Sequence, residues 1–255
     1  AGEHSGRCAC TVPSMTKPDI VHVPVEWRKA LVRGRFTVLL AFLLGLVGVV
    51  PFFEGHEGAL ALVRLMLSAV LLAALYVSTR HARDLIIAAA FLIPGLTGRW
   101  LSDSGLNPEL QVGAALCTTV FLALVTTGVL RQVLHPGRVT YDTISGAICA
   151  YLMIGVTFSF VYLAMELQWP GAFTLAGSVT LADLAKTHDE LQRIIYFSFV
   201  TLTTLGYGDI VPAIGPARAV SALEAIVGQM YVAILVARLV ALHILHSERE
   251  RLARE

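Results

Sequence analysis

Long apolar runs with few charges constrain the fold of this chain more than any other feature of its sequence. Soluble domains have about 25% charged residues, whereas this chain of 255 residues has 15% charged and 56% hydrophobic residues. A helix needs about 20 mostly apolar residues to cross the hydrocarbon core of a bilayer. Runs of about this length occupy residues 36–53, 59–78, 85–101, 110–130, 143–165 and 217–246. They predict an all-α membrane protein with six transmembrane helices.

The rest of the chain consists of polar loops and two tails. Residues 1–35 contain several prolines and no apolar period, so we expect a cytoplasmic N-terminal tail, and residues 247–255 form a charged C-terminal tail. The third run is the weakest, because Pro94-Gly95 interrupts it and is expected to kink it. Two of the four cysteines fall inside apolar runs, and the other two lack a second ligand pair. Neither a disulfide framework nor a metal site is therefore expected.

The basic residues near the ends of the runs predict the orientation of the chain. With six crossings, ten of them lie on one side of the membrane: Lys29, Arg33, Arg35, Arg80, Arg83, Arg131, Arg138, Arg249, Arg251 and Arg254. The positive side of a membrane protein is cytoplasmic. We therefore expect a multi-pass protein of a plasma membrane, such as a bacterial inner membrane, with both termini in the cytoplasm. Membrane lipid is its expected surrounding, and the net charge of +1 gives no indication of a nucleic-acid partner.

A glycine-rich stretch, Thr201-Leu-Thr-Thr-Leu-Gly-Tyr-Gly-Asp209, lies between the last two long runs. Gly206 and Gly208 alternate with residues that have side chains, and glycine adopts positive φ without steric cost. Such an alternation can turn successive carbonyls the same way, so that symmetry-related copies form oxygen rings that replace the water shell of an ion. A bare Gly-Tyr-Gly is usually an ordinary turn. Here a short apolar run at residues 194–204 precedes the glycines, and this context favours a pore.

The segment Thr204-Leu205-Gly206-Tyr207-Gly208-Asp209 closely resembles the selectivity filter of potassium channels, which usually have valine at the position of Leu205. The resemblance covers about residues 141–246 and implies an outer helix, a re-entrant pore helix, the filter and an inner helix. It implies that K+ binds to the carbonyls of Thr204, Leu205, Gly206 and Tyr207 and to the Thr204 hydroxyl. One filter per chain implies a homotetramer around one pore. K+ is the permeant ion, and no cofactor is expected.

The residues that support the filter depart from the family pattern. Potassium channels place an aspartate at the position of Asp209, where it typically accepts a hydrogen bond from a tryptophan of the pore helix. The matching residues of this chain are Tyr196 and Phe197, and Phe197 has no donor. We expect Tyr196 to bind elsewhere behind the filter and Phe197 to pack in the core. The hydrogen-bonded support of this filter is therefore expected to be thinner than in the family.

Several residues of the last run are candidates for gating or for lining the cavity. Gly228 lies where potassium channels often have a hinge glycine, but glycines in membrane helices are just as often close-packing positions. Gln229, Val232, Val236 and Val240 recur at helical spacing and are candidates for lining the cavity and the inner gate. The alternative for the valines is packing against lipid or other helices.

Glu224 is a carboxylate inside the last apolar run. Such a charge is costly, usually faces the protein interior and is a functional candidate. We expect Glu224 to be hydrogen-bonded or protonated and to brace the pore helix against the inner helix. The competing interpretation is a cavity charge that concentrates K+.

Residues 36–139 occupy the position of a voltage sensor but lack its regularly spaced arginines. The run at residues 110–130 contains no arginine, and Arg131 lies at its cytoplasmic end. A charge that crosses the membrane field contributes only about 2.3 kcal/mol per 100 mV, so a steep response needs several charges per subunit. We therefore expect a four-helix scaffold without strong voltage sensing, followed by a pore domain at residues 140–246.

These features together predict passive, potassium-selective conduction through a tetrameric pore. One alternative is a weakly selective cation channel, although the intact Gly-Tyr-Gly argues against it. A secondary transporter is another, but the two halves of the chain show neither internal repeats nor paired broken helices. The sequence has no Gly-x-Ser-Gly element, no His-Glu-x-x-His pair and no paired intramembrane aspartates, so we do not expect an enzyme.

Overall fold

The computed structural model describes residues 35–49, 52, 59–78, 82–101, 107–134, 141–175, 179–180 and 190–252. The predicted N-terminal tail and most of the polar loops lie outside these residues. The described helices are α2 (Arg35–Leu44) with its π-helical continuation η1 (Gly45–Val49), α3 (Ala59–Ser78), α4 (Ala82–Leu101), α5 (Pro108–Leu134), α6 (Tyr141–Gln168), α8 (Glu190–Leu202) and α9 (Gly215–Leu252). Each predicted apolar run therefore contains a helix.

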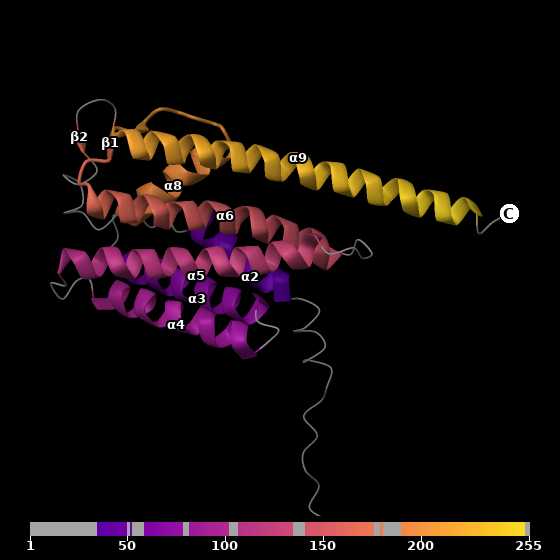
Figure 1. Cartoon of the computed structure of the whole chain (residues 1–255), viewed down its shortest axis with the longest axis horizontal. Helices are drawn as coiled ribbons and strands as arrows, with labels where there is room; N and C mark the ends of the chain where they lie inside the picture. Colours follow the sequence, from indigo (N-terminus) through magenta and orange to yellow (C-terminus); the bar gives the residue numbers. More distant parts are fainter. Residues whose placement is uncertain are drawn as a thin grey trace, which may run out of the picture. The chain divides into compact units, whose positions relative to one another are not determined.

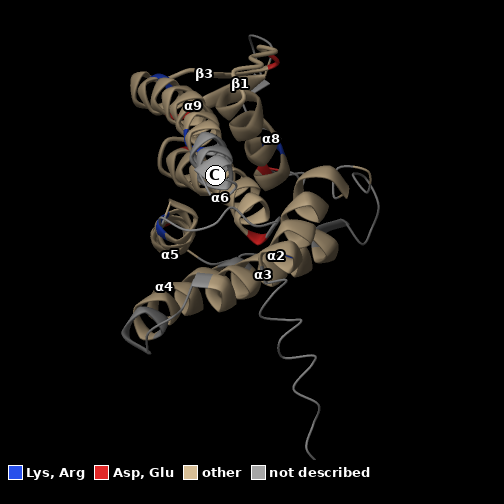
Figure 2. Cartoon of the chain, turned by 90° about the vertical axis from the view of Figure 1, so that its right-hand side faces the viewer, with Lys and Arg blue, Asp and Glu red and all other residues tan. Residues whose placement is uncertain are grey.

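Three of these helices are long and apolar enough to cross a membrane. Their membrane-length parts are Glu109–Leu134, Asp142–Gln168 and Gly215–Arg238, and the apolar parts of the other helices, Phe36–Val49, Ala61–Val77 and Ile86–Gly98, are shorter. In Figure 2 most of the coloured helical residues are neither acidic nor basic. The chain is thus a mostly helical membrane protein.

Helix α6 is central to the packing of the described residues. It contacts α5 and α2 on the side of the first four predicted spans, and α8 and α9 on the side of the filter (Figure 1). Its side chains Met153, Phe160 and Tyr162 are almost completely buried. The Tyr231 hydroxyl of α9 donates to the Ala147 carbonyl of α6 at 2.6 Å, and Arg238 donates to the Val133 carbonyl in the last turn of α5. Helix α9 is therefore hydrogen-bonded to α6 through Tyr231 and to α5 through Arg238.

The Pro94-Gly95 pair lies inside one continuous helix, so the pair does not end the helix, and the expected kink stays a prediction. The two glycines of this segment instead allow α4 to approach α5 closely. A Cβ at Gly95 would lie 2.4 Å from the Thr118 hydroxyl oxygen, and a Cβ at Gly98 would lie 2.3 Å from the Ala114 Cβ. Small residues are the usual means of such close helix contacts in membranes.

A three-stranded antiparallel sheet adjoins the filter, although the sequence predicted only a loop before it. Strand β1 (Phe173–Leu175) lies between β2 (Val179–Thr180) and β3 (Ile210–Pro212). Leu175 pairs with Ile210, directly after the filter, and Phe173 pairs with Pro212. Strands of two or three residues are too short to give an apolar alternation, which is why the sequence did not predict them. The pairing ties the exit of the filter to the chain that follows α6.

The buried carboxylate of Glu166 holds the turn before β1. Its two oxygens accept hydrogen bonds from the backbone nitrogens of Gly171 at 2.8 Å and Phe173 at 3.0 Å. Gly171 has a φ of 88°, a conformation that glycine adopts without strain. The carboxylate therefore satisfies backbone donors of a tight turn and positions β1 for its pairing with β3.

Candidate ion-conduction site

The chain leaves α8 and folds back over the last turn of that helix to form the glycine-rich stretch. The nitrogen of Thr204 donates to the Thr201 carbonyl at 2.9 Å, and the nitrogens of Leu205 and Gly206 both donate to the Val200 carbonyl, at 2.9 and 3.3 Å. The helix end thus supplies acceptors for the start of the stretch. All residues from 203 to 209 are exposed in the single chain, as expected for a segment that faces a pore.

The backbone of this stretch alternates in handedness. Thr204, Gly206 and Gly208 have φ values of 57°, 59° and 77°. The two glycines therefore adopt the positive φ expected from the sequence. The sequence did not predict the positive φ of Thr204, because this conformation is a genuine outlier for a β-branched residue. Its side-chain oxygen donates to the Thr203 carbonyl at 2.7 Å and accepts from the Gln229 amide at 3.1 Å, and these bonds hold it in place.

Gly206→Ala tests the backbone of the stretch. Apart from the two neighbouring residues, no described residue has an atom within 4 Å of a Cβ added at Gly206, so the substitution acts through its φ of 59° and not through a clash. An alanine at positive φ costs about 1 kcal/mol or more in each subunit. We expect loss of ion selectivity or conduction while assembly persists, measured by ion flux and by size-exclusion chromatography. Gly113→Ala, which also adds a Cβ in open space but has no positive φ, is the matched control.

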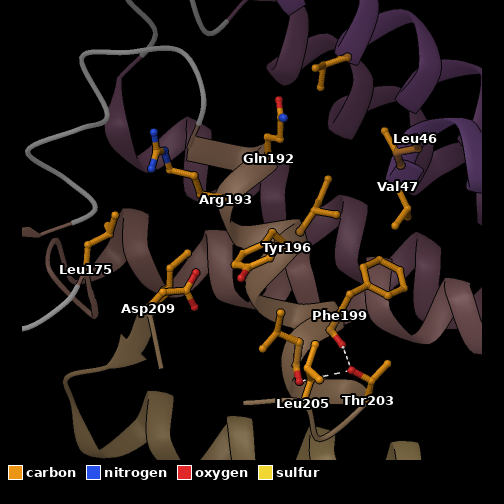
Figure 3. A pocket seen from close by; sticks show the side chains of 14 residues that line it. Leu46, Val47, Leu175, Gln192, Arg193, Tyr196, Phe199, Thr203, Leu205 and Asp209 are labelled. Carbon is orange, nitrogen blue, oxygen red and sulfur yellow. Dashed lines mark hydrogen bonds between the residues drawn. The ribbon is translucent and has the colours of Figure 1, made fainter. Parts of the chain in front are cut away.

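Tyr196, which the sequence predicted to bind elsewhere behind the filter, lies beside Asp209 (Figure 3). Their side chains point toward one another behind the filter (Figure 3). A phenol hydroxyl is protonated at neutral pH and can donate to a carboxylate. A possible donor therefore lies beside Asp209 at the place where the resemblance implies a tryptophan, and the thinner support of the filter stays a prediction.

Phe197 packs in the core, as predicted. It is 5% exposed, and its ring centroid lies 5.2 Å from that of Tyr162 and 5.1 Å from that of Phe173. The three rings come from α8, α6 and β1. They form an aromatic cluster that fixes α8 against the outer helix and the sheet.

Glu224 is completely buried where α6, α8 and α9 meet. The Tyr162 hydroxyl donates to one carboxyl oxygen at 2.5 Å, and the Ser198 hydroxyl lies 2.5 Å from the other. The Ser198 hydroxyl also lies 2.7 Å from the Gly155 carbonyl of α6. Glu224 is therefore hydrogen-bonded, as expected, and its contacts include the predicted pore helix. The sequence missed Tyr162 and Ser198, because nothing in their local pattern marks them as partners of a residue on another helix.

Gly228 allows close approach of α9 to the end of α8. A Cβ at this position would lie 2.3 Å from the Leu202 carbonyl oxygen and 3.0 Å from its Cδ1. Helix α9 is continuous through Gly228. Of the two interpretations left open by the sequence, hinge and close packing, the geometry favours close packing.

The candidate cavity residues lie on a helix that has little cover in the single chain. Val232, Val236 and Val240 are about half exposed, and Gln229 is exposed as well. Only 11% of the most apolar 18-residue segment of Gly215–Arg238 is buried, whereas 61% of the corresponding segment of Asp142–Gln168 is buried. Exposure alone therefore does not separate cavity-lining from packing positions. The contact of Gln229 with Thr204 does distinguish that residue.

A mostly apolar cavity of about 410 Å³ lies behind the filter (Figure 3). It is bounded on one side by α8 and by Leu205 and Asp209 of the filter stretch, and on the other by Leu46 and Val47 of η1 and Val63 of α3. The outer surface of the filter is thus not fully packed by its own chain. Scaffold residues and filter residues meet at this cavity.

Comparison with known proteins supports the class of protein that this site suggests. Residues 172–243, which contain α8, the filter stretch and most of α9, match a family described as ion channel. The match covers the part of the chain in which the candidate filter lies.

Two curated proteins are similar to parts of the chain. Protein LctB of Bacillus caldotenax is 27% identical over 125 residues, which are 49% of this chain and 90% of that protein. Two pore potassium channel c of Oryza sativa subsp. japonica is 38% identical over 92 residues, which are 36% of this chain and only 17% of the plant protein. No solved structure matches the chain significantly.

Proposed function

We propose that this chain is one subunit of a homotetrameric potassium channel. Residues 140–246 form the pore domain and residues 36–139 a scaffold, with six membrane crossings and both termini in the cytoplasm of the cell. The carbonyls of residues 204–207 and the Thr204 hydroxyl bind dehydrated K+ in the filter. The channel opens without strong voltage dependence, because no regularly spaced arginines lie in residues 110–130.

The backbone of the filter stretch is the single observation that best supports this proposal. Positive φ at residues 204, 206 and 208 alternates with negative φ at residues 205 and 207. Consecutive carbonyls of such a backbone can face one direction, which is what an oxygen-lined ion path requires. The similarity of 92 residues of the chain to a plant two pore potassium channel favours K+ as the ion.

Ion flux through the purified protein in liposomes tests the proposal. We expect K+ to permeate at least about tenfold better than Na+, a difference of about 1.4 kcal/mol between the two ions. Bi-ionic reversal potentials in planar bilayers measure this ratio directly. Equal permeability would replace the proposal with a weakly selective cation channel. Uptake that requires a second, coupled ion gradient would instead favour a secondary transporter.

A further inference from the structure

The side chain of Gln229 in α9 contacts the Thr204 hydroxyl, the first oxygen ligand of the candidate filter in the chain. Its Nε2 lies 3.1 Å from the Thr204 hydroxyl oxygen, and no other side-chain hydrogen bond in the described part of the chain joins α9 to the glycine-rich stretch. The preceding residue, Gly228, packs against the Leu202 carbonyl so closely that a Cβ has no room. The backbone from which the Gln229 side chain extends is therefore fixed against the base of the filter.

The hydrogen bonds of the Thr204 hydroxyl determine what it presents to an ion. Its single hydrogen is directed to the Thr203 carbonyl, 2.7 Å away. One lone pair of the oxygen accepts the hydrogen of the Gln229 amide. A hydroxyl has two acceptor lone pairs, so the second remains for another ligand. Without the Gln229 donor, the Thr203 bond alone holds the hydroxyl, and the Thr204 side chain can turn its oxygen away from the ion path.

We propose that Gln229 is a positioning residue of the ion path, whose amide holds the Thr204 hydroxyl so that an oxygen lone pair faces a cation entering from the cavity. This inference rests on the proposed function. It assigns Gln229 an action on the innermost ion site, beyond the lining role expected from helical spacing. In a tetramer the bond occurs four times, so a small effect in each subunit multiplies around the ring.

Block by Ba²⁺ from the cavity side tests the inference. Ba²⁺ is a divalent ion of about the radius of K+, so it binds the same oxygens more tightly and reports their arrangement. Gln229→Met keeps the length of the side chain but removes the donor. We expect the Ba²⁺ concentration for half block to rise about tenfold or more, since one lost hydrogen bond per subunit acts at a shared site. Met230→Leu is the matched control, because it changes an exposed neighbour that makes no side-chain hydrogen bond to the glycine-rich stretch among the described residues.

Two further variants separate positioning from a general effect of cavity polarity. Gln229→Asn keeps the amide but is one methylene too short to reach Thr204, and we expect it to weaken block as Gln229→Met does. In a Thr204→Ala background, Gln229→Met should have no additional effect, because the hydroxyl on which it acts is gone. Wild-type block by Ba²⁺ in a conducting Gln229→Met channel, or an undiminished effect in the Thr204→Ala background, overturns the inference while leaving the proposed function intact. A wild-type protein that passes no K+ overturns the proposed function itself.

Discussion

Gly228→Ala is expected to abolish conduction and to destabilise the assembled protein. The new Cβ would lie 2.3 Å from the Leu202 carbonyl oxygen, which is a backbone atom and cannot rotate away as a flexible side chain can. Relief requires α9 to move away from the end of α8. Forcing an extra methyl group into a packed interface costs about 1–3 kcal/mol, and a tetramer contains four such contacts. The same displacement would draw Gln229 away from Thr204 at the base of the filter.

The alternative interpretation of Gly228 as a hinge predicts a different outcome. Alanine favours a helix over glycine by about 1 kcal/mol, so a hinge variant would remain folded and would change only its opening. Single-channel recording and thermal unfolding of the Gly228→Ala tetramer separate the two interpretations. Gly113→Ala in α5, where nothing lies within 4 Å of the added Cβ, should leave both measurements unchanged. A stable, conducting Gly228→Ala channel with altered opening would show that close packing is the wrong interpretation.

The sequence predicted those parts of the fold that depend on local pattern. Apolar runs indicated the helices, because burial in lipid requires continuous apolar surface. The spacing of Gly206 and Gly208 indicated positive φ, which the backbone has. Thr204 was not expected there, since its conformation depends on hydrogen bonds with Thr203 and Gln229 and not on its own preference.

Contacts between distant parts of the chain were the main omission. The bond of Gln229 to Thr204 joins residues 25 positions apart, and that of Tyr162 to Glu224 joins residues 62 positions apart. No single-sequence pattern specifies such pairs. The family pattern of a tryptophan donor also gave no indication that Tyr196 lies beside Asp209, because a residue of another type can point toward Asp209 from the same helix (Figure 3). Residue chemistry predicted that Glu224 needs partners, but only the fold identifies them.

The buried carboxyl group of Glu224, the hydroxyls of Tyr162 and Ser198 and the Gly155 carbonyl form a cluster whose hydrogen bonds predict the protonation state of Glu224. Three short contacts join Tyr162 to Glu224, Ser198 to Glu224 and Ser198 to the Gly155 carbonyl. The two hydroxyls supply only two hydrogens for these contacts. A proton on Glu224 supplies the third, donated to the Ser198 oxygen, while Ser198 donates to Gly155. We therefore expect Glu224 to be a neutral carboxylic acid that links α6, α8 and α9.

Glu224→Leu is expected to destabilise the tetramer strongly, whereas Glu224→Gln should be tolerated. Leucine leaves the buried Tyr162 hydroxyl without the acceptor it has now, and a buried polar group without a partner costs about 1–3 kcal/mol in each subunit. Glutamine reproduces the neutral acid, because its amide nitrogen can donate to Ser198 and its oxygen can accept from Tyr162. Thermal unfolding of the detergent-solubilised tetramer and single-channel open probability measure both effects.

The competing interpretation of Glu224 as a cavity charge makes the opposite prediction for glutamine. A charge that concentrates K+ would be lost in Glu224→Gln, so conductance would fall at low salt and recover at high salt, where such fields are screened. The geometry opposes this interpretation, because the carboxyl group is 0% exposed even in the single chain and both of its oxygens are bonded within it. A conductance loss in Glu224→Gln that high salt rescues, with unchanged tetramer stability in Glu224→Leu, would show that the bracing role is wrong. Because leucine and glutamine differ little in volume, the contrast between the two variants isolates the hydrogen bonds from the packing of the site.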